Sequence, residues 1–363
     1  MRRILFISNG HGETAIAARI AAEMLEVARV PLGLDLFPLV GLGAGAAPLA
    51  LVGPRATMPS GGLVAMGNVR AFARDLGAGW LGLFASQVRF LRSVRARYGT
   101  IVAVGDAYAA ALARLARRPW LFVGTAKSEY VAPYGAIERG IIGAATRVFV
   151  RDAATADALR RHGIRAEAPG NVIVDLLAEE RRYAWPGPVR IALLPGSRER
   201  AYLDAERIAA IVEGVSAQVP GVAAVLSIAP ALDPARFAPL LERHPALGVW
   251  FDGIGGILAG ATLAIGQAGT ANEAAAASGV PVVALELAGD RRAGWYRMRQ
   301  ERLLADALLV VPGEPAAATA AVVALLNDPG RLARMGAAGR ERMGPSGGAA
   351  AIARAIAELA PSV

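Results

Sequence analysis

Residues able to transfer protons or bind anions lie in three short segments of this sequence, and each segment directly follows an apolar stretch. The first is Asn-Gly-His-Gly-Glu over residues 9–13, which follows ILFIS and contains one of the three histidines of the chain. The second is Asp106, which follows TIVAVG, and the third is GTAKSEY, with Lys127 and Glu129. Carboxylates and histidines can act as general bases, and a lysine can bind a negatively charged group. His11 could instead be a turn histidine that caps its own backbone.

Lys127 is the only lysine of the chain, since the other 38 of its 39 basic residues are arginine. A sequence that uses arginine almost everywhere yet keeps one lysine suggests a specific function for that amine. The other interpretation is that a lysine persists by chance at an indifferent surface position. Both interpretations stand at this point.

A segment in the second half of the chain is suited to binding phosphate. LLPGSRER (193–200) predicts a strand, a Pro-Gly turn and a helix start, with Ser197 as the cap and Arg198 in the first turn. The N–H groups of a first helical turn favour an anion, and a guanidinium donates two parallel hydrogen bonds to a phosphate. Most Gly-Ser-Arg turns are simply capped helices, so this segment alone is weak support for phosphate binding.

The segment IGQAGTANEAAAASGVPVV (265–283) repeats this pattern with a buried strand, a glycine turn and a helix of small residues. Gly269 and Thr270 would present bare backbone at the helix start, and Glu273 could hydrogen-bond a ribose diol. The alternative is a packing helix whose Glu273 faces solvent. Two such helix starts favour a nucleotide diphosphate, and the absence of a full Gly-x-Gly-x-x-Gly pattern argues against NAD.

The predicted strands and helices, which position these segments, alternate along the whole chain. Apolar strands that alternate with helices predict parallel sheets covered on both faces. We expect an α/β fold of two doubly wound, Rossmann-like domains facing each other across a cleft, with ligands at the carboxyl ends of the strands. The expected strands are 2–8, 100–105, 120–124 and 147–152 in the first half and 190–196, 223–229, 248–252, 261–266 and 280–286 in the second. The expected helices include 13–28, 107–118, 203–218 and 270–278.

The length of 363 residues exceeds one ordinary core and favours two domains. We expect an N-terminal domain over 1–177 and a C-terminal domain over 190–345. The charged and then Pro/Gly-containing stretch 178–189 is expected to link them. Residues 346–363 are expected to form a helix that packs back on the N-terminal domain.

The amino-acid composition and charge of the chain exclude several classes of protein. The absence of cysteine excludes disulfides, thiol catalysis and zinc sites of the cysteine type. No unbroken apolar run is long enough to span a bilayer, and the chain begins directly in a strand, so we expect a cytoplasmic protein. The net charge of +9 suits an anionic partner. None of the usual nucleic-acid-binding motifs occurs, so we expect no nucleic-acid partner.

Several of these motifs together resemble a known family. LLPGSR, the Gly-Thr helix start followed by small residues and Gly-x-Pro, and GN-x-x-x-D (170–175) are similar to lipid-A-disaccharide synthase, a metal-independent glycosyltransferase of the two-Rossmann GT-B type. SNGHGE, MPSGG (58–62), AVGD (103–106), VGTAKSEY (123–130) and ERMGPSG (341–347) resemble more closely the lipid-A-disaccharide synthase-related family. The motifs follow one another in order along nearly the whole chain.

The resemblance implies an inverting, metal-independent glycosyltransferase that needs no cofactor. It would move an N-acetylglucosamine- or acylated glucosamine-type unit from a UDP-sugar to a lipid or lipid-linked acceptor. The implied catalytic residues are Asp106 as the general base, then His11 and Glu13. The implied donor-binding residues are Gly196, Ser197, Arg198, Gln267, Gly269, Thr270, Asn272 and Glu273. The implied acceptor-binding residues are Gly10, Gly12, Lys127, Ser128, Glu129 and Asn171.

The sequence departs from the synthase at two positions. Glu273 stands one residue earlier than the acidic residue of the synthase, which would fall on Ala274. The turn Gly-His-Gly-Glu replaces the Gly-Glu-x-x-Gly-Asp turn of the synthase and is closer to the His-bearing glycine loop of the peptidoglycan N-acetylglucosaminyl transferase.

Residues 68–98 combine aromatic and aliphatic side chains with arginines. A basic amphipathic helix with exposed aromatic residues can lie on an anionic membrane surface. The other interpretation is a helix pair packed against the first sheet. Because the resemblance implies a lipid substrate, we expect peripheral association with the inner face of the cytoplasmic membrane through a face between Ala71 and Leu91. The membrane-contacting candidates are Phe72, Trp80, Leu83 and Phe84.

Two other functions fit the same fold. One is chemistry similar to that of UDP-N-acetylglucosamine 2-epimerase, which would form a free sugar and need no lipid. The other is a non-catalytic protein that binds a nucleotide-sugar or a lipid. The presence of both Asp106 and Arg198 argues against the loss of catalysis.

Overall fold

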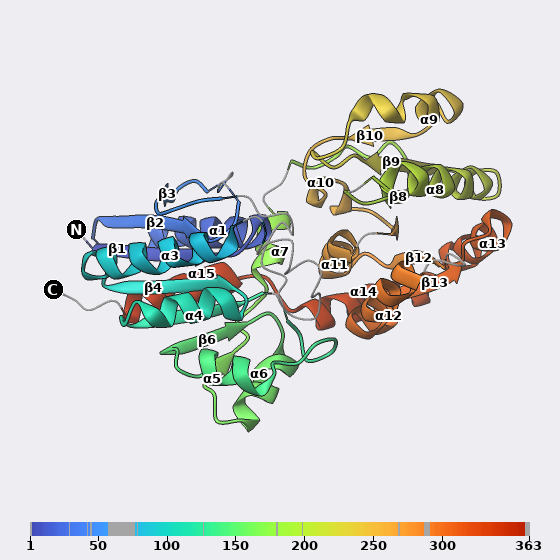
Figure 1. Ribbon diagram of the computed structural model, residues 1–363. Coiled ribbons are helices and arrows are strands. Elements are labelled where there is room, and N and C mark those ends of the chain that lie inside the picture. The colour runs from blue at the N-terminus through green and yellow to red at the C-terminus, as the bar shows by residue number, and fades with distance from the viewer. Residues whose placement is uncertain are drawn as a thin grey trace. The chain divides into compact units, whose positions relative to one another are not determined.

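The computed structural model describes residues 2–28, 30–41, 43, 46–56, 77, 79–125, 127–178, 181–197, 199–267, 269–286 and 291–359. The chain divides into two compact units, each built around its own parallel β-sheet. Unit 1 comprises Met1–Asp175 and Ser346–Val363, and unit 2 comprises Leu176–Pro345. Figure 1 labels the strands and helices of both units.

Unit 1 contains a sheet of seven strands in the order β3-β2-β1-β4-β5-β6-β7, and all paired neighbours run parallel. The strands are β1 (Arg2–Ser8), β2 (Leu32–Pro38), β3 (Ala50–Leu51), β4 (Thr100–Gly105), β5 (Trp120–Gly124), β6 (Arg147–Val150) and β7 (Ala166–Glu167). The apolar runs β4 and β5 are buried at every position, as expected for central parallel strands with helices on both faces. Sequence analysis located β1, β4, β5 and β6.

The helices of unit 1 follow the strands that they cover. They are α1 (His11–Val27), α3 (Trp80–Val94), α4 (Ala107–Leu115), α5 (Ala136–Ile142), α6 (Ala153–Arg161) and α15 (Gly348–Leu359), with a short 3₁₀ helix η1 (Arg95–Arg97). Helix α7 (Val172–Ala178) passes from unit 1 into unit 2. The C-terminal helix α15 packs against α1, so the two ends of the chain belong to the same unit (Figure 1).

Asp175 holds the start of α15. Its carboxylate accepts hydrogen bonds from the backbone N–H groups of Gly347 at 2.5 Å and Ala349 at 2.8 Å. Gly348 lies against the backbone of Gly170, where any side chain would collide with the carbonyl oxygen. The two motifs GN-x-x-x-D and GPSG therefore contact each other, and this contact fixes the return of the chain to unit 1.

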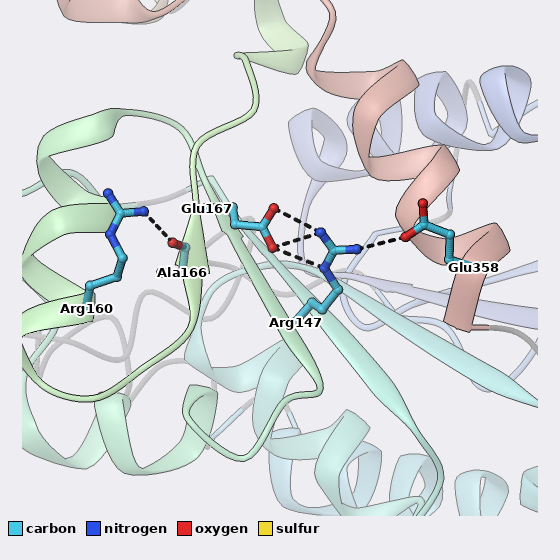
Figure 2. A network of polar contacts seen from close by, with 5 residues as sticks. All are labelled: Arg147, Arg160, Ala166, Glu167 and Glu358. Carbon is cyan, nitrogen blue, oxygen red and sulfur yellow. Dashed lines mark hydrogen bonds and ion pairs between the residues drawn. The ribbon is translucent and has the colours of Figure 1, made fainter.

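A second contact of α15 involves charged residues at the sheet edge (Figure 2). Arg147 on β6 donates to both carboxylate oxygens of Glu167 on β7, at 2.8 and 2.9 Å, and to Glu358 on α15 at 3.3 Å. Arg160 on α6 donates to the carbonyl oxygen of Ala166 at 2.8 Å. These bonds attach the short edge strand β7 to its neighbours. The side chains of Glu167 and Glu358 are 45% and 71% exposed, so each ion pair stabilises the fold only weakly.

Unit 2 contains a parallel sheet of six strands in the order β10-β9-β8-β11-β12-β13. The strands are β8 (Val189–Leu194), β9 (Val222–Ser227), β10 (Gly248–Trp250), β11 (Leu263–Gly266), β12 (Val282–Glu286) and β13 (Leu308–Pro312). The helices are α8 (Ala201–Ser216), α9 (Ala238–Arg243), α10 (Gly255–Leu258), α11 (Gly269–Ala277), α12 (Arg291–Leu304), α13 (Pro315–Leu326) and α14 (Pro329–Met343). Sequence analysis located β8 to β12 and did not expect β13.

Small residues bring α14 close to α11. A Cβ added at Gly339 would lie 2.5 Å from the carbonyl oxygen of Ala276, and Gly336 lies against Gly279 in the same way. The four alanines 274–277 at the end of α11 are buried. The small-residue pattern of 265–283 therefore serves close helix packing, whatever the start of α11 binds.

Part of the expected linker packs onto unit 2. Tyr183 donates its backbone N–H to Gly256 at 2.9 Å. Its ring meets those of Trp185 and Trp250 edge to face, with centroids 5.2 and 5.5 Å away. The boundary between the units falls between Asp175 and Leu176, within α7.

Candidate functional site

The carboxyl ends of β1 and β4 lie side by side in unit 1, because the strands pair from Ile4 with Thr100 to Ser8 with Val104. This pairing brings together two of the three chemically active segments, although they lie far apart in the sequence. The side-chain amide of Asn9 donates to Asp106 Oδ2 at 2.8 Å. Asn9 is itself almost fully buried. The sequence analysis did not single out Asn9, although it lies inside the SNGHGE motif.

Asp106 is the N-cap of α4. Its Oδ1 atom accepts hydrogen bonds from the backbone N–H groups of Tyr108 at 3.0 Å and Ala109 at 3.2 Å. Burial raises the pKa of Asp106 above its ordinary value, and the hydrogen bonds from Ala109, Asn9 and Tyr108 oppose that shift. The carboxylate is thus held in one orientation at the end of β4.

Glu13 lies in the first turn of α1, over two glycines. Gly10 and Gly105 both have positive φ angles, of 140° and 126°. A Cβ at Gly10 would lie 2.6 Å from Glu13 Oε2, and one at Gly105 would lie 2.9 Å from Glu13 Cγ. Only glycine leaves room for this side chain at both strand ends.

The environment of Glu13 favours its protonated form. Burial raises the pKa of Glu13, a backbone hydrogen bond opposes the shift, and the negative charge of Asp106 adds to it. Glu13 and Asp106 therefore form a half-buried carboxyl pair, the arrangement expected of groups that accept and release protons. Gly12 borders open space, and the side chain of His11 lies outside the described part of the structure, so its role stays a prediction.

Lys127 follows β5, the next strand of the sheet. Its Nζ donates to Glu138 Oε2 at 2.6 Å and to the carbonyl oxygen of Pro133 at 3.3 Å. Glu138 Oε2 also accepts from the backbone N–H of Gly135 at 2.7 Å, at the start of α5. The lysine therefore neutralises a buried carboxylate that caps a helix. Lys127 is not at an indifferent surface position, and its ion-pair partner lies eleven residues further along the chain.

The other predicted acceptor-binding residues also make local contacts. Ser128 is buried, and its Oγ accepts from the backbone N–H of Tyr130 at 3.3 Å. Glu129 donates its backbone N–H to Thr155 Oγ1 at 2.8 Å. Asn171 is buried at the start of α7, where its Oδ1 accepts from the backbone N–H of Ile173 at 3.1 Å. Their contact with an acceptor stays a prediction.

In unit 2, the predicted helix start after LLPGSR needs correction. Helix α8 begins at Ala201, with Arg200 at the N-cap and no side-chain capping bond, so Ser197 does not cap it. Gly196 has a φ of 116° and turns the chain at the end of β8. Asp204, in the first turn of α8, is held by Arg200 at 3.2 Å and Arg207 at 3.1 Å. Arg198 lies outside the described residues, and its role as a phosphate ligand stays a prediction.

The second glycine turn of unit 2 lies beside the first, because Gly266 pairs with Leu194 across β11 and β8. Gln267 binds Leu285 on β12 through two hydrogen bonds, both of 3.2 Å. Asn272 is fully buried and donates to the carbonyl oxygen of Gly266 at 3.2 Å and to Gln300 Oε1 at 2.9 Å. These residues brace the turn, and sequence analysis did not find Gln300 because it lies on the distant helix α12.

The start of α11 leaves some predicted donor-binding residues accessible. Gly269 and Thr270 are exposed at its first turn, and Glu273 is half-buried one turn further on. The sheet therefore presents two neighbouring turns, one ending at Ser197 and one leading into Thr270. Binding of a nucleotide there stays a prediction.

The predicted membrane-contacting residues are partly packed. Trp80 stacks on Phe84 with centroids 5.4 Å apart, and both rings approach Tyr108 on α4. Leu83 is half-buried, Phe72 lies outside the described residues, and Leu81 is 63% exposed. Leu91 belongs to the hydrophobic core, so it is no part of an insertion face. Among the described helices, none is both long and apolar enough to cross a bilayer.

Comparison with known proteins extends this description. No protein-family model matches the chain, and no curated protein matches its sequence. The fold resembles the UDP-GlcNAc 2-epimerase of Neisseria meningitidis bound to UDP-GlcNAc, with 12% identity, coverage of 98% of this chain and 99% of that chain, and a TM-score of 0.63. It also resembles MurG of Acinetobacter baumannii, with 15% identity, coverage of 99% and 100%, and a TM-score of 0.61.

A third similar structure is the glycotransferase of kitacinnamycin, with 18% identity, coverage of 99% of both chains and a TM-score of 0.59. Identities this low establish the fold alone. The chain therefore has two Rossmann-like α/β domains with parallel sheets, the GT-B fold. The fold class expected from the sequence is confirmed.

Proposed function

We propose that this protein is a nucleotide-sugar enzyme, a GT-B glycosyltransferase that moves a sugar from a UDP-sugar to a hydroxyl of a lipid or lipid-linked acceptor. The observation that carries the proposal is the half-buried carboxyl pair Glu13 and Asp106 at the carboxyl edge of the unit 1 sheet. Two of the compared structures support it further, because they are described as a UDP-GlcNAc complex and as a glycotransferase. The sequence motifs favour the lipid-A-disaccharide synthase-related family.

In the proposed reaction, the carboxyl pair takes the proton of the acceptor hydroxyl. The acceptor oxygen then bonds to the anomeric carbon of the donor sugar as the bond from that carbon to UDP breaks, which inverts the anomeric configuration. Asp106 is the proposed base, and the amide of Asn9 and the backbone N–H groups of Tyr108 and Ala109 hold it in place. Arg198 and the exposed start of α11 are proposed to stabilise the departing diphosphate, without a metal ion.

The second candidate is a UDP-N-acetylglucosamine 2-epimerase-like activity. It is favoured by the likeness to an epimerase over nearly the full length of both chains. A half-buried carboxyl pair can also exchange a proton with a sugar carbon. The two activities differ in product, because the epimerase would release a free sugar without any lipid acceptor.

Calorimetric binding of UDP, with ADP and GDP as controls, tests the first step of both activities. We expect selective binding of UDP by the wild type and loss of binding in Arg198→Ala. Incubation of UDP-sugars with and without lipid acceptors then separates transfer from epimerisation by product. If no nucleotide binds, the proposal fails and a lipid-binding protein without catalysis becomes the better interpretation.

A further inference from the structure

An apolar groove of about 500 Å³ lies on unit 1 among helices α3, α4 and α5. Its volume falls in the range of small-molecule sites, which are mostly apolar with a few polar groups at the edge. Helix α4 packs against both α3 and α5 and supplies most of the lining residues. Its lining includes Phe84 on α3, Tyr108, Ala111, Arg114 and Leu115 on α4, and Arg117 just beyond it.

The aromatic wall of the groove is held in place by buried hydrogen bonds. The phenol of Tyr108 donates to Gln87 Oε1 at 2.7 Å, and Gln87 Nε2 donates to the carbonyl oxygen of Leu39 at 2.7 Å. Gln87 is fully buried. Phe84 approaches Tyr108, with ring centroids 6.3 Å apart. The groove is therefore formed before any ligand arrives, which lowers the entropy cost of binding.

The surface around the groove carries charge of one sign. Residues 80–118 contain seven arginines and a single carboxylate, Asp106, which is committed to the cap of α4. In the described part of the chain, no ion pair joins any of these arginines to a carboxylate. Arg114 and Arg117 border the groove itself, and Arg114 is exposed while it donates to the carbonyl oxygen of Gly140 at 3.2 Å. Such a surface is complementary to an anionic head attached to an apolar chain.

We propose that this groove binds one anionic phospholipid, with an acyl chain along α4 between Phe84 and Leu115 and the phosphate on Arg114 and Arg117. The groove itself suits an acyl chain, because most of its lining is aliphatic or aromatic. The arginines select the charge, since a guanidinium donates two hydrogen bonds to a phosphate. This lipid is an anchor of the protein on a bilayer and takes no part in sugar transfer, so the inference goes beyond the proposed function.

Calorimetric titration with monomeric 1-acyl lysophosphatidic acids of stepwise longer chain tests the site without a bilayer. Burial of each methylene predicts an affinity gain of about four-fold. We expect this gain to stop once the groove is filled. An affinity that is independent of chain length, or that rises through the longest chains as in simple partition, would overturn the proposal.

Ala111→Trp fills the groove and should abolish binding. The matched control is Ala320→Trp, at an exposed position of α13 in unit 2, which should bind as the wild type does. Leu115→Asp at the mouth of the groove is a second variant that keeps the core intact, because Leu115 is 41% exposed. Equal binding by wild type and either groove variant refutes the site.

The charge is tested by Arg114→Glu combined with Arg117→Glu. This variant should lose most of its affinity for lysophosphatidic acid and keep the chain-length dependence. The control variant Arg331→Glu with Arg334→Glu on α14 changes the net charge by the same amount and should leave lipid binding unchanged. An equal loss of lipid affinity in both double variants would show that only net charge matters and would contradict the site. UDP titration of the same samples separates the two proposals. UDP binding without lipid binding would refute the lipid site alone. Lipid binding without UDP binding would refute the proposed function alone.

Discussion

The partial burial of Glu13 affects both the stability of the protein and the chemistry of this carboxyl group. The raised pKa of Glu13 means that the folded protein holds this proton more tightly than the unfolded chain does. The free energy of unfolding therefore falls as the pH rises from the ordinary pKa of a glutamic acid through the raised value in the folded protein. Ionisation of Glu13 lowers the stability of the folded protein, although Gly10 and Gly105 leave room for its side chain. A residue kept at such a position is a candidate for function.

We predict that Glu13→Gln is more stable than the wild type at neutral pH and less active. The substitution removes a half-buried charge and keeps the shape of the side chain. The gain in Tm should disappear in acid, below the ordinary pKa of glutamic acid, where Glu13 is protonated in both states. Thermal unfolding over a pH series checks this, and a Tm difference that does not change with pH would contradict it.

Lys127 poses a different question, because its ion pair with Glu138 gives it a role within unit 1. We predict that Lys127→Met lowers the free energy of unfolding by about 2 kcal/mol or more, since it leaves a buried carboxylate without its charge partner. The double variant Lys127→Met with Glu138→Gln should recover much of this loss, because the amide oxygen can still cap α5. Urea unfolding measures both.

Comparison of the single and double variants distinguishes a structural role of Lys127 from a direct contact with the acceptor. If the double variant recovers both stability and transfer, Lys127 acts through Glu138 only. If it recovers stability and not transfer, the amine also contacts the acceptor. No loss of stability in the single variant would show that the ion pair contributes nothing.

At the scale of elements, the contact between α14 and α11 depends on glycine. We predict that Gly339→Ala destabilises unit 2 by about 1–3 kcal/mol, because the new methyl group would lie 2.5 Å from the carbonyl oxygen of Ala276. Gly330→Ala on the same helix is the matched control: Gly330 is exposed, so the higher helix propensity of alanine should raise stability or leave it unchanged. Equal effects of the two substitutions in urea unfolding would show that the close approach is unimportant.

At the scale of the whole molecule, the arginine-rich surface predicts a bilayer preference. We expect the protein to sediment with vesicles of anionic phospholipid more than with zwitterionic ones, and high salt should weaken this binding. Leu81→Asp should reduce it further, because Leu81 is 63% exposed on α3. Leu203→Asp on α8 of unit 2, 53% exposed, is the control. Sedimentation that responds to neither salt nor Leu81→Asp would contradict membrane association.

The strands that carry the chemistry could be predicted because central parallel strands are continuous apolar runs, and here a glycine lies at or just after the end of each. The fold class could be predicted for the same reason. Sequence analysis did not find β2 or β13, and it placed the start of α8 wrongly. The cap expected at Ser197 looked favourable locally, but α8 begins at Ala201, where Arg200 and Arg207 hold Asp204. The ion pairs of Asp204 with Arg200 and Arg207 lie in the first turn of the observed helix.

The sequence by itself determined that this chain forms two Rossmann-like units and that glycine turns follow their central strands, because these features depend on neighbouring residues. Only the tertiary structure decided which turns meet. Asn9 and Asp106 are 97 residues apart, and they bond because β4 pairs with β1 on the side opposite β2. Likewise, Asp175 caps a helix that begins more than a hundred residues later. Such pairings follow from the order in which strands and helices pack, which no local pattern encodes.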